Sequence, residues 1–220
     1  MKSINRASLA EIVYTKLKKY IITGKFKLGQ QIVDSDIAEM LNVSKTPVRE
    51  ALLQLKVDGL IVIKPRSGTF VFLFTLEDIR ALTSARFFLE DGALKTAYER
   101  EPVRLIKHLS QNIAKSYELL EKDNLSGYLD LDQEFHSIFF AIAGNPYLET
   151  AYQTLFSKIS ALRHRLVFTR EFVTTSINSH SLIVNYIIEE DIEMARKRLS
   201  EHINKTFNDE SLQYLVEGPK

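Results

Sequence analysis

The chain has 220 residues, of which 45% are hydrophobic, and a formal net charge of +1 at pH 7; these values suit one large domain or two smaller ones, each with a core. The absence of cysteine excludes a disulfide framework, and no apolar run approaches the ~20 residues of a membrane-spanning helix. Residues 1–10 lack the apolar core of a signal peptide, so we expect a soluble, cytoplasmic protein that does not contact a membrane.

The charge is unevenly distributed along the chain. Residues 1–74 contain 12 Lys and Arg against 6 Asp and Glu, a balance of +6, whereas residues 75–220 contain 17 against 22, a balance of −5. This split predicts two domains, residues 1–74 and residues 75–220, and makes the basic one a candidate for binding nucleic acid.

The first domain reads as three helices followed by a β-hairpin. Apolar spacing predicts helices at Ser8–Thr23, at Asp36–Leu41 with Asp34 or Ser35 as its cap, and from about residue 44 to Val57. Two short apolar runs predict the strands of the hairpin, Leu60–Ile63 and Thr69–Leu73. Gly68 falls in the turn between them, where a positive φ is often required.

The second domain reads as helical throughout. The sequence TLED, which begins at Thr75, predicts the start of its first helix, because a hydroxyl residue precedes acidic residues there. The predicted helices are Glu77–Tyr98, Pro102–Lys122, Leu125–Ala143, Pro146–Arg170, Thr174–Glu190 and Ile192–Asn208. The expected fold is therefore mainly α: an N-terminal winged helix-turn-helix followed by an all-helical bundle.

The stretch NVSKTPVREAL, residues 42–52, places positive charge at the start of a helix. Lys45 and Arg49 there oppose the helix dipole, so we expect an anion outside the helix to attract them. A tight turn between two helices, the second opening with basic groups, is typical of a helix-turn-helix. Ser44 and Thr46 can then donate hydrogen bonds to phosphate oxygens of the DNA, and Arg49 can donate to the edge of a guanine base.

The hairpin would form the wing of this DNA-binding domain. Its tip carries Lys64, Arg66, Ser67 and Gly68. A basic wing tip can follow the DNA backbone or enter a minor groove.

The second domain contains a candidate metal site. His136 lies four residues after Asp132, which puts both on one helical face with Cβ atoms roughly 5–6 Å apart. His180 and His202 lie on the last two predicted helices, at equal distances from the turn near residue 191, so a helical hairpin would bring them together. One carboxylate and three imidazoles suit Zn²⁺ or another divalent transition metal. The same spacing also fits a helix-surface contact and ordinary buried histidines.

Several of these stretches resemble a known family. SKTPVREAL, the DGL at residues 58–60 and PRSGTFV are similar to the winged helix-turn-helix of GntR-type bacterial transcription regulators, as are IITGKFKLGQQI and DIAEMLNVS. Lys45 departs from the pattern, since the family usually carries Arg there. Lys keeps the attraction to phosphate but loses bidentate base readout.

Residues 79–208 resemble the ligand-binding FCD domain of the FadR-like branch of that family. The motifs that carry this resemblance are Arg86-x-x-x-Glu90, Asp132-x-x-Phe135-His136, Gly144–Asn145, His180 and Ala195…His202. The resemblance implies a metal bound by Asp132, His136, His180 and His202, with zinc the first choice and nickel or manganese as alternatives.

The resemblance further implies a small organic acid as effector. Arg86 would then bind its carboxylate, with Arg165 and Asn185 as further candidates for the cavity. The alternative for Arg86 is an ion pair with Glu90 within one helix, and for the other two a solvated or packing role.

Taken together, the sequence predicts a homodimeric transcription regulator, a repressor, that binds double-stranded operator DNA with an affinity set by a small carboxylate. We expect it not to be an enzyme. The alternatives are a metal-dependent enzyme in a helical bundle and a helix-turn-helix used for protein interaction; against the enzyme, the chain lacks the H-E-x-x-H and glycine-rich phosphate motifs.

Overall fold

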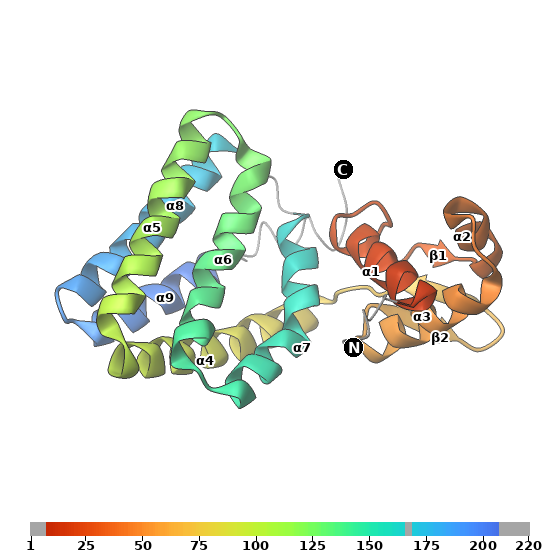
Figure 1. The fold of residues 1–220 in the computed structure, drawn as a ribbon, viewed down its shortest axis with the longest axis horizontal. Coiled ribbons are helices and arrows are strands. Elements are labelled where there is room, and N and C mark those ends of the chain that lie inside the picture. Colours follow the sequence, from red (N-terminus) through yellow and green to blue (C-terminus); the bar gives the residue numbers. More distant parts are fainter. Residues whose placement is uncertain (1–7, 166–168, 207–220) are drawn as a thin grey trace, which may run out of the picture. The chain divides into compact units, whose positions relative to one another are not determined.

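The computed structural model describes residues 8–165 and 169–206. The described residues form two compact units (Figure 1). The first unit contains the chain up to Phe74 together with Ser157–Arg165, and the second contains Thr75–Phe156 and the described residues that follow Arg165.

The first unit contains three helices and a small sheet. Its elements are α1 (Leu9–Ile22), β1 (Gln31–Ile32), α2 (Asp34–Leu41), α3 (Lys45–Val57), β2 (Ile61–Lys64) and β3 (Gly68–Val71). Helix α1 begins with a capping box, in which Ser8 and Glu11 bond reciprocally to each other's backbone. Its buried stripe, Val13, Leu17 and Ile21, lies in the core with Val48, Leu52 and Leu55 of α3. The helical spacing of these residues is what predicted both helices.

The connection between α2 and α3 is a tight turn. Asn42 adopts the left-handed conformation with φ 53°, and its N–H is directed at the carbonyls of Ala38 and Glu39. Asn tolerates this conformation better than most residues with a side chain. The expected cap of α2 is wrong: the helix begins at Asp34 itself, and Val33 occupies the cap position without a side-chain hydrogen bond.

The sheet has three antiparallel strands in the order β1-β3-β2. Strands β2 and β3 form the predicted hairpin, but Gly68, expected in the turn, is the first residue of β3 and pairs with Lys64. Strand β1 pairs Gln31 with Phe70 and was not predicted, because two residues are too few for a periodic pattern. Gly68 has φ 117°, and a Cβ there would lie 2.7 Å from Gln31 Nε2, so this position requires glycine.

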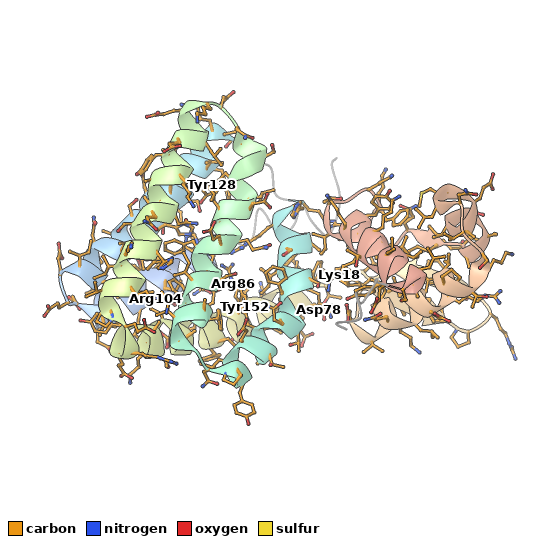
Figure 2. The ribbon with its side chains drawn as sticks, in the orientation of Figure 1. Lys18, Asp78, Arg86, Arg104, Tyr128 and Tyr152 are labelled. Atoms are coloured by element: carbon orange, nitrogen blue, oxygen red, sulfur yellow. The ribbon has the colours of Figure 1, made fainter. Side chains whose placement is uncertain are left out.

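The second unit is built from helices (Figures 1 and 2). They are α4 (Leu76–Arg100), α5 (Pro102–Glu121), α6 (Leu125–Ala143), the first part of α7 (Pro146–Arg163), α8 (Arg170–Ile188) and α9 (Ile192–Thr206). The predicted start of α4 agrees with its capping box of Thr75 and Asp78. Helices α4, α5, α6, α8 and α9 pack against one another around fully buried apolar residues such as Leu109, Phe139, Ile183 and Leu199.

The long helix predicted over Pro146–Arg170 is wrong, since α7 ends at Arg163 and Arg170 already begins α8. The Thr169 hydroxyl accepts a hydrogen bond from the N–H of Phe172 and thereby caps α8. Helix α8 consequently starts four residues before the predicted Thr174. The predicted end of the last helix, at residues 207–208, lies outside the described residues.

Both units agree with the predicted fold class, a winged helix-turn-helix followed by a helical bundle. Among the described residues, no helix is both long and apolar enough to cross a lipid bilayer.

Candidate metal centre and nucleic-acid interface

Helix α3 presents its N-terminal side chains to solvent. Lys45, Thr46 and Arg49 are exposed, whereas Pro47 and Val48 are buried. The Ser44 hydroxyl makes no hydrogen bond to the helix start, so it does not serve as the cap its position suggests. This arrangement fixes the helix through its apolar side and leaves its cationic side for a partner.

Arg49 is held by an acidic neighbour. Its Nε donates to Asp34 Oδ2 over 2.7 Å, although the Arg49 side chain is 66% exposed. This hydrogen bond lowers the pKa of Asp34 from its usual value. Because the bond uses Nε, the two terminal nitrogens of Arg49 keep the fork that can bind guanine O6 and N7.

The wing tip is exposed as well. Lys64, Arg66 and Ser67 are exposed, and Gly68 is half-buried. Gln31 of β1 donates to the carbonyl of Ser67 over 3.2 Å, which ties the tip to the neighbouring strand.

The four residues of the predicted metal site come together inside the helical unit. Asp132 and His136 lie on α6, His180 on α8 and His202 on α9, all buried, and each offers a ligand atom within 4.8 Å of the others. His180 Nε2 lies 3.1 Å from His202 Nε2 and 3.7 Å from Asp132 Oδ1. The ring of Phe135 stacks on His180, with 3.8 Å between centroids, and so fixes its orientation.

Glu90 of α4 lies against one nitrogen of the His136 ring. Glu90 Oε2 lies 2.7 Å from His136 Nδ1, and both side chains are fully buried. A proton on Nδ1 then leaves the lone pair of His136 on Nε2, as is typical of histidines that bind metals beside a carboxylate. The same carboxylate accepts from the Tyr152 hydroxyl over 3.2 Å.

Arg86 is fully buried and paired with Glu90. Its Nε donates to Glu90 Oε1 over 2.7 Å, and one terminal nitrogen lies 3.0 Å from His136 Nε2. Burial works to lower the pKa of Arg86, but the Glu90 charge outweighs it and the pKa is raised, so the guanidinium stays charged. Its other terminal nitrogen has no hydrogen-bond partner among the described residues.

A second hydrogen-bonded chain reaches Asp132. The Tyr128 hydroxyl lies 2.8 Å from Ser176 Oγ and 3.4 Å from Asp132 Oδ1. Tyr128 is therefore in position to orient the carboxylate that faces the three histidines.

The donor set fits a divalent transition metal. Ligands at about 2.0–2.2 Å from Zn²⁺ lie no more than about 4.4 Å from one another. The four candidate ligand atoms, now within 4.8 Å of one another, would therefore have to move only slightly closer together to bind the ion. One buried carboxylate and three imidazoles neutralise part of the metal charge and suit zinc, nickel or manganese. A His136 ring with its proton on Nδ1, beside Glu90, has its lone pair on Nε2, where a terminal nitrogen of Arg86 lies 3.0 Å away and would have to yield to a metal.

Two of the residues predicted to bind the effector are not part of the metal cluster. Arg165 belongs to the first unit, where its terminal nitrogens donate to the carbonyls of Ile21 and Ile22 at the end of α1; burial lowers its pKa. Asn185 is exposed on α8, because five residues along a helix from His180 turn its side chain well away from that histidine's face.

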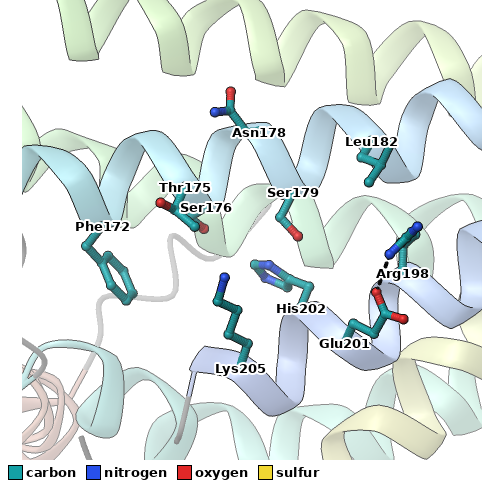
Figure 3. A pocket seen from close by; sticks show the side chains of 10 residues that line it. All are labelled: Phe172, Thr175, Ser176, Asn178, Ser179, Leu182, Arg198, Glu201, His202 and Lys205. Carbon is teal, nitrogen blue, oxygen red and sulfur yellow. Dashed lines mark hydrogen bonds and ion pairs between the residues drawn. The ribbon is translucent and has the colours of Figure 1, made fainter.

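A pocket of about 440 Å³ opens beside the cluster, between α8 and α9 (Figure 3). His202 belongs both to this pocket and to the metal cluster. The remaining residues that line it are Phe172, Thr175, Ser176, Asn178, Ser179, Leu182, Arg198, Glu201 and Lys205.

Sequence reasoning identified Glu90 only as the partner of Arg86 and missed its contact with His136. It also missed Tyr128, Tyr152 and Lys205. The spacing of Tyr128 four residues before Asp132 could have indicated the first. Nothing in the sequence pairs Tyr152 with Glu90, since 62 residues separate them.

An exposed cationic helix in a winged helix-turn-helix, joined in one chain to a helical domain with a buried Asp/His₃ group, defines a class of protein: a DNA-binding regulator with a sensing domain. Comparison with known proteins gives the family. Residues 9–71 match the model of the bacterial regulatory proteins of the gntR family, and residues 81–205 match the FCD domain.

This chain belongs to the GntR family of transcription regulators with a C-terminal FCD domain. It is 26% identical over 211 residues to YdhC of Bacillus subtilis, an HTH-type transcriptional regulator, covering 94% of this chain and 92% of the other. It is 27% identical over 223 residues to the HTH-type transcriptional repressor NanR of Edwardsiella tarda, covering 92% and 85%.

Solved structures share the fold. A GntR regulator from Rhodococcus sp. RHA1 superposes with a TM-score of 0.76 at 20% identity, covering 97% of this chain and all of the other. McbR/YncC of E. coli gives 0.74 at 23% identity, covering 91% and 96%. The chain is accordingly a DNA-binding transcription regulator with an effector-binding domain, and its relatives are regulators and not enzymes.

Proposed function

We propose that this regulator is a cytoplasmic, homodimeric repressor whose operator affinity changes when a small carboxylate binds in its metal-containing FCD domain. The observation that carries this proposal is the buried group of Asp132, His136, His180 and His202. Three neutral imidazoles and one carboxylate leave a net positive charge on a bound divalent cation. The centre therefore favours an anion as its next ligand.

The DNA would be bound by α3 and the wing. Lys45 and Thr46 are exposed for phosphates, while Arg49 carries a free fork for a base edge. At the wing tip, Lys64, Arg66 and Ser67 are exposed for the backbone or the minor groove. Two copies would engage the half-sites of a near-palindrome.

Asp132, His136, His180 and His202 would hold the metal, with Glu90 fixing His136 and Tyr128 fixing Asp132. When bound, the metal supplies Lewis-acid attraction for a carboxylate oxygen. Arg86 carries a buried positive charge; one of its terminal nitrogens lies beside His136, and the other has no hydrogen-bond partner among the described residues, so it can add a charge-assisted hydrogen bond.

The experiment measures binding of the zinc-loaded full chain to DNA selected from a random library, with and without a set of small organic acids. We expect at least one acid to change the affinity by about 1–3 kcal/mol, and chelation of the metal to abolish this response. An unchanged affinity for every acid would refute the proposed response. Sedimentation that gives only monomer, with and without DNA, would refute the dimer.

A further inference from the structure

We propose that the effector extends from the metal centre into the pocket between α8 and α9, and that Lys205 binds a second anionic group on it. The effector would therefore be a dicarboxylate. This inference rests on the proposed function and deepens it, because it adds a part of the binding site and the chemical class of the ligand.

The pocket continues from the metal centre. The Nε2 of His202 lies 3.1 Å from that of His180, and the same side chain forms part of the pocket wall. Ser176 also belongs to both, since it lines the pocket and contacts the Tyr128 hydroxyl that bonds Asp132. A ligand bound to the metal beside His202 would have its remaining atoms in the pocket that His202 lines.

The pocket carries an uncompensated positive charge. Arg198 and Glu201 on its wall pair with each other over 2.6 Å and largely cancel. Within the described part of the chain, Lys205 forms no hydrogen bond or ion pair. Figure 3 shows its side chain directed from α9 toward α8, beside His202. The pocket therefore attracts an anion at Lys205.

The facing side of α8 supplies hydrogen-bond donors. Thr175 and Ser179 line the pocket, and their hydroxyls have no hydrogen-bond partner within the described residues. At the pocket's two ends lie the apolar side chains of Phe172 and Leu182. This combination suits a short carbon chain that ends in a carboxylate.

A metal held by His202 and the ammonium of Lys205 would be two positive centres on one face of α9. His202 and Lys205 are three residues apart on α9, so their Cβ atoms are about 5–6 Å apart. A monocarboxylate can satisfy only one of these centres. A dicarboxylate with a short carbon chain can satisfy both, and the pocket volume of about 440 Å³ accommodates it.

The test uses isothermal titration of the zinc-loaded full chain with malonate, succinate, L-malate and glutarate, and with acetate, propionate and lactate for comparison. We expect the best dicarboxylate to bind roughly tenfold more tightly than the best monocarboxylate. Lys205→Met should remove this advantage while leaving the zinc content unchanged. Lys205→Arg should retain most of it, because it keeps the charge.

Lys197→Met is the matched control, because it removes an exposed lysine of α9 that does not line the pocket. Dicarboxylates that bind no more tightly than monocarboxylates would overturn the inference. An advantage that survives Lys205→Met, or falls equally in Lys197→Met, would overturn it as well. In each of those cases, a monocarboxylate that still alters DNA affinity would leave the proposed function intact; no response to any acid would remove both.

Discussion

The two units of this regulator use charge in opposite ways. In the DNA-binding unit, Lys45 and Arg49 stand at the surface, and the side chain of Arg49 is 66% exposed. In the helical unit, Arg86 and Glu90 are both 0% exposed. An exposed charge costs the fold little and remains available to a large partner, whereas a buried charge requires a partner inside the protein. The first kind suits the proposed surface for DNA, and the second kind suits the proposed site for a small ligand.

The largest effect expected from this contrast is on stability. Arg86→Met leaves the Glu90 carboxylate buried without its cation, and we expect a loss of about 3–5 kcal/mol in the free energy of unfolding. Urea denaturation measures it. Arg49→Met, at an exposed position, should change stability by no more than about 0.5 kcal/mol.

The double variant Arg86→Met/Glu90→Gln is the control, because it removes both charges of the pair and should regain part of the loss. Equal denaturation midpoints for the wild type and Arg86→Met would contradict the importance assigned to the buried pair.

The next largest effect on stability is expected from metal binding. Zinc at a hundredfold excess over its dissociation constant should stabilise the protein by about 2.7 kcal/mol, because the four ligands assemble only in the folded chain. His202→Ala should lose most of this gain in a thermal melt. His108→Ala, which removes an exposed histidine of α5, should keep it; similar losses in both variants would argue against the assigned ligands.

DNA recognition should respond to Arg49. Arg49→Ala should weaken binding to a selected operator by about 1–3 kcal/mol and relax the preference at one base position. Fluorescence anisotropy with the operator and with single-base variants measures both. Lys115→Ala, an exposed cation of α5, is the control. Unchanged discrimination in Arg49→Ala would show that Arg49 does not read a base.

The smallest effect is expected for Lys45, which we propose contacts a phosphate. Lys45→Ala should weaken binding to all sequences about equally and reduce the slope of log affinity against log salt by about one. Titrations at several salt concentrations determine this slope. A loss confined to one sequence would instead assign base readout to Lys45.

Both the helices and the candidate metal ligands could be predicted from the sequence, but on different grounds. Helices such as α1 and α4 could be predicted because apolar spacing and capping sequences act within a few residues. The four candidate metal ligands could be proposed from the i,i+4 pair Asp132 and His136, from the hairpin symmetry of the other two, and from the family resemblance. Local helix geometry and one turn account for each pair, whereas the packing of α6 against α8 brings the two pairs together.

What escaped prediction depends on contacts between distant segments. Strand β1 forms because Gln31 pairs with Phe70 on the neighbouring strand. Its two residues are too few to show the alternating pattern of a strand in the sequence. The break before α8 depends on the Thr169 cap, which the continuous apolar spacing of that region conceals. The role of Glu90 depends on His136, 46 positions away in the sequence, and on no local motif.

The position of His202 on the final described helix has a consequence for biosynthesis. A ribosome makes the chain from its N-terminus, and a domain folds as a unit once its elements have emerged. Asp132, His136 and His180 are synthesised first, so the last of the four proposed metal ligands becomes available only when α9 leaves the ribosome. A nascent or prematurely terminated FCD domain that lacks α9 would therefore not assemble the complete proposed ligand set.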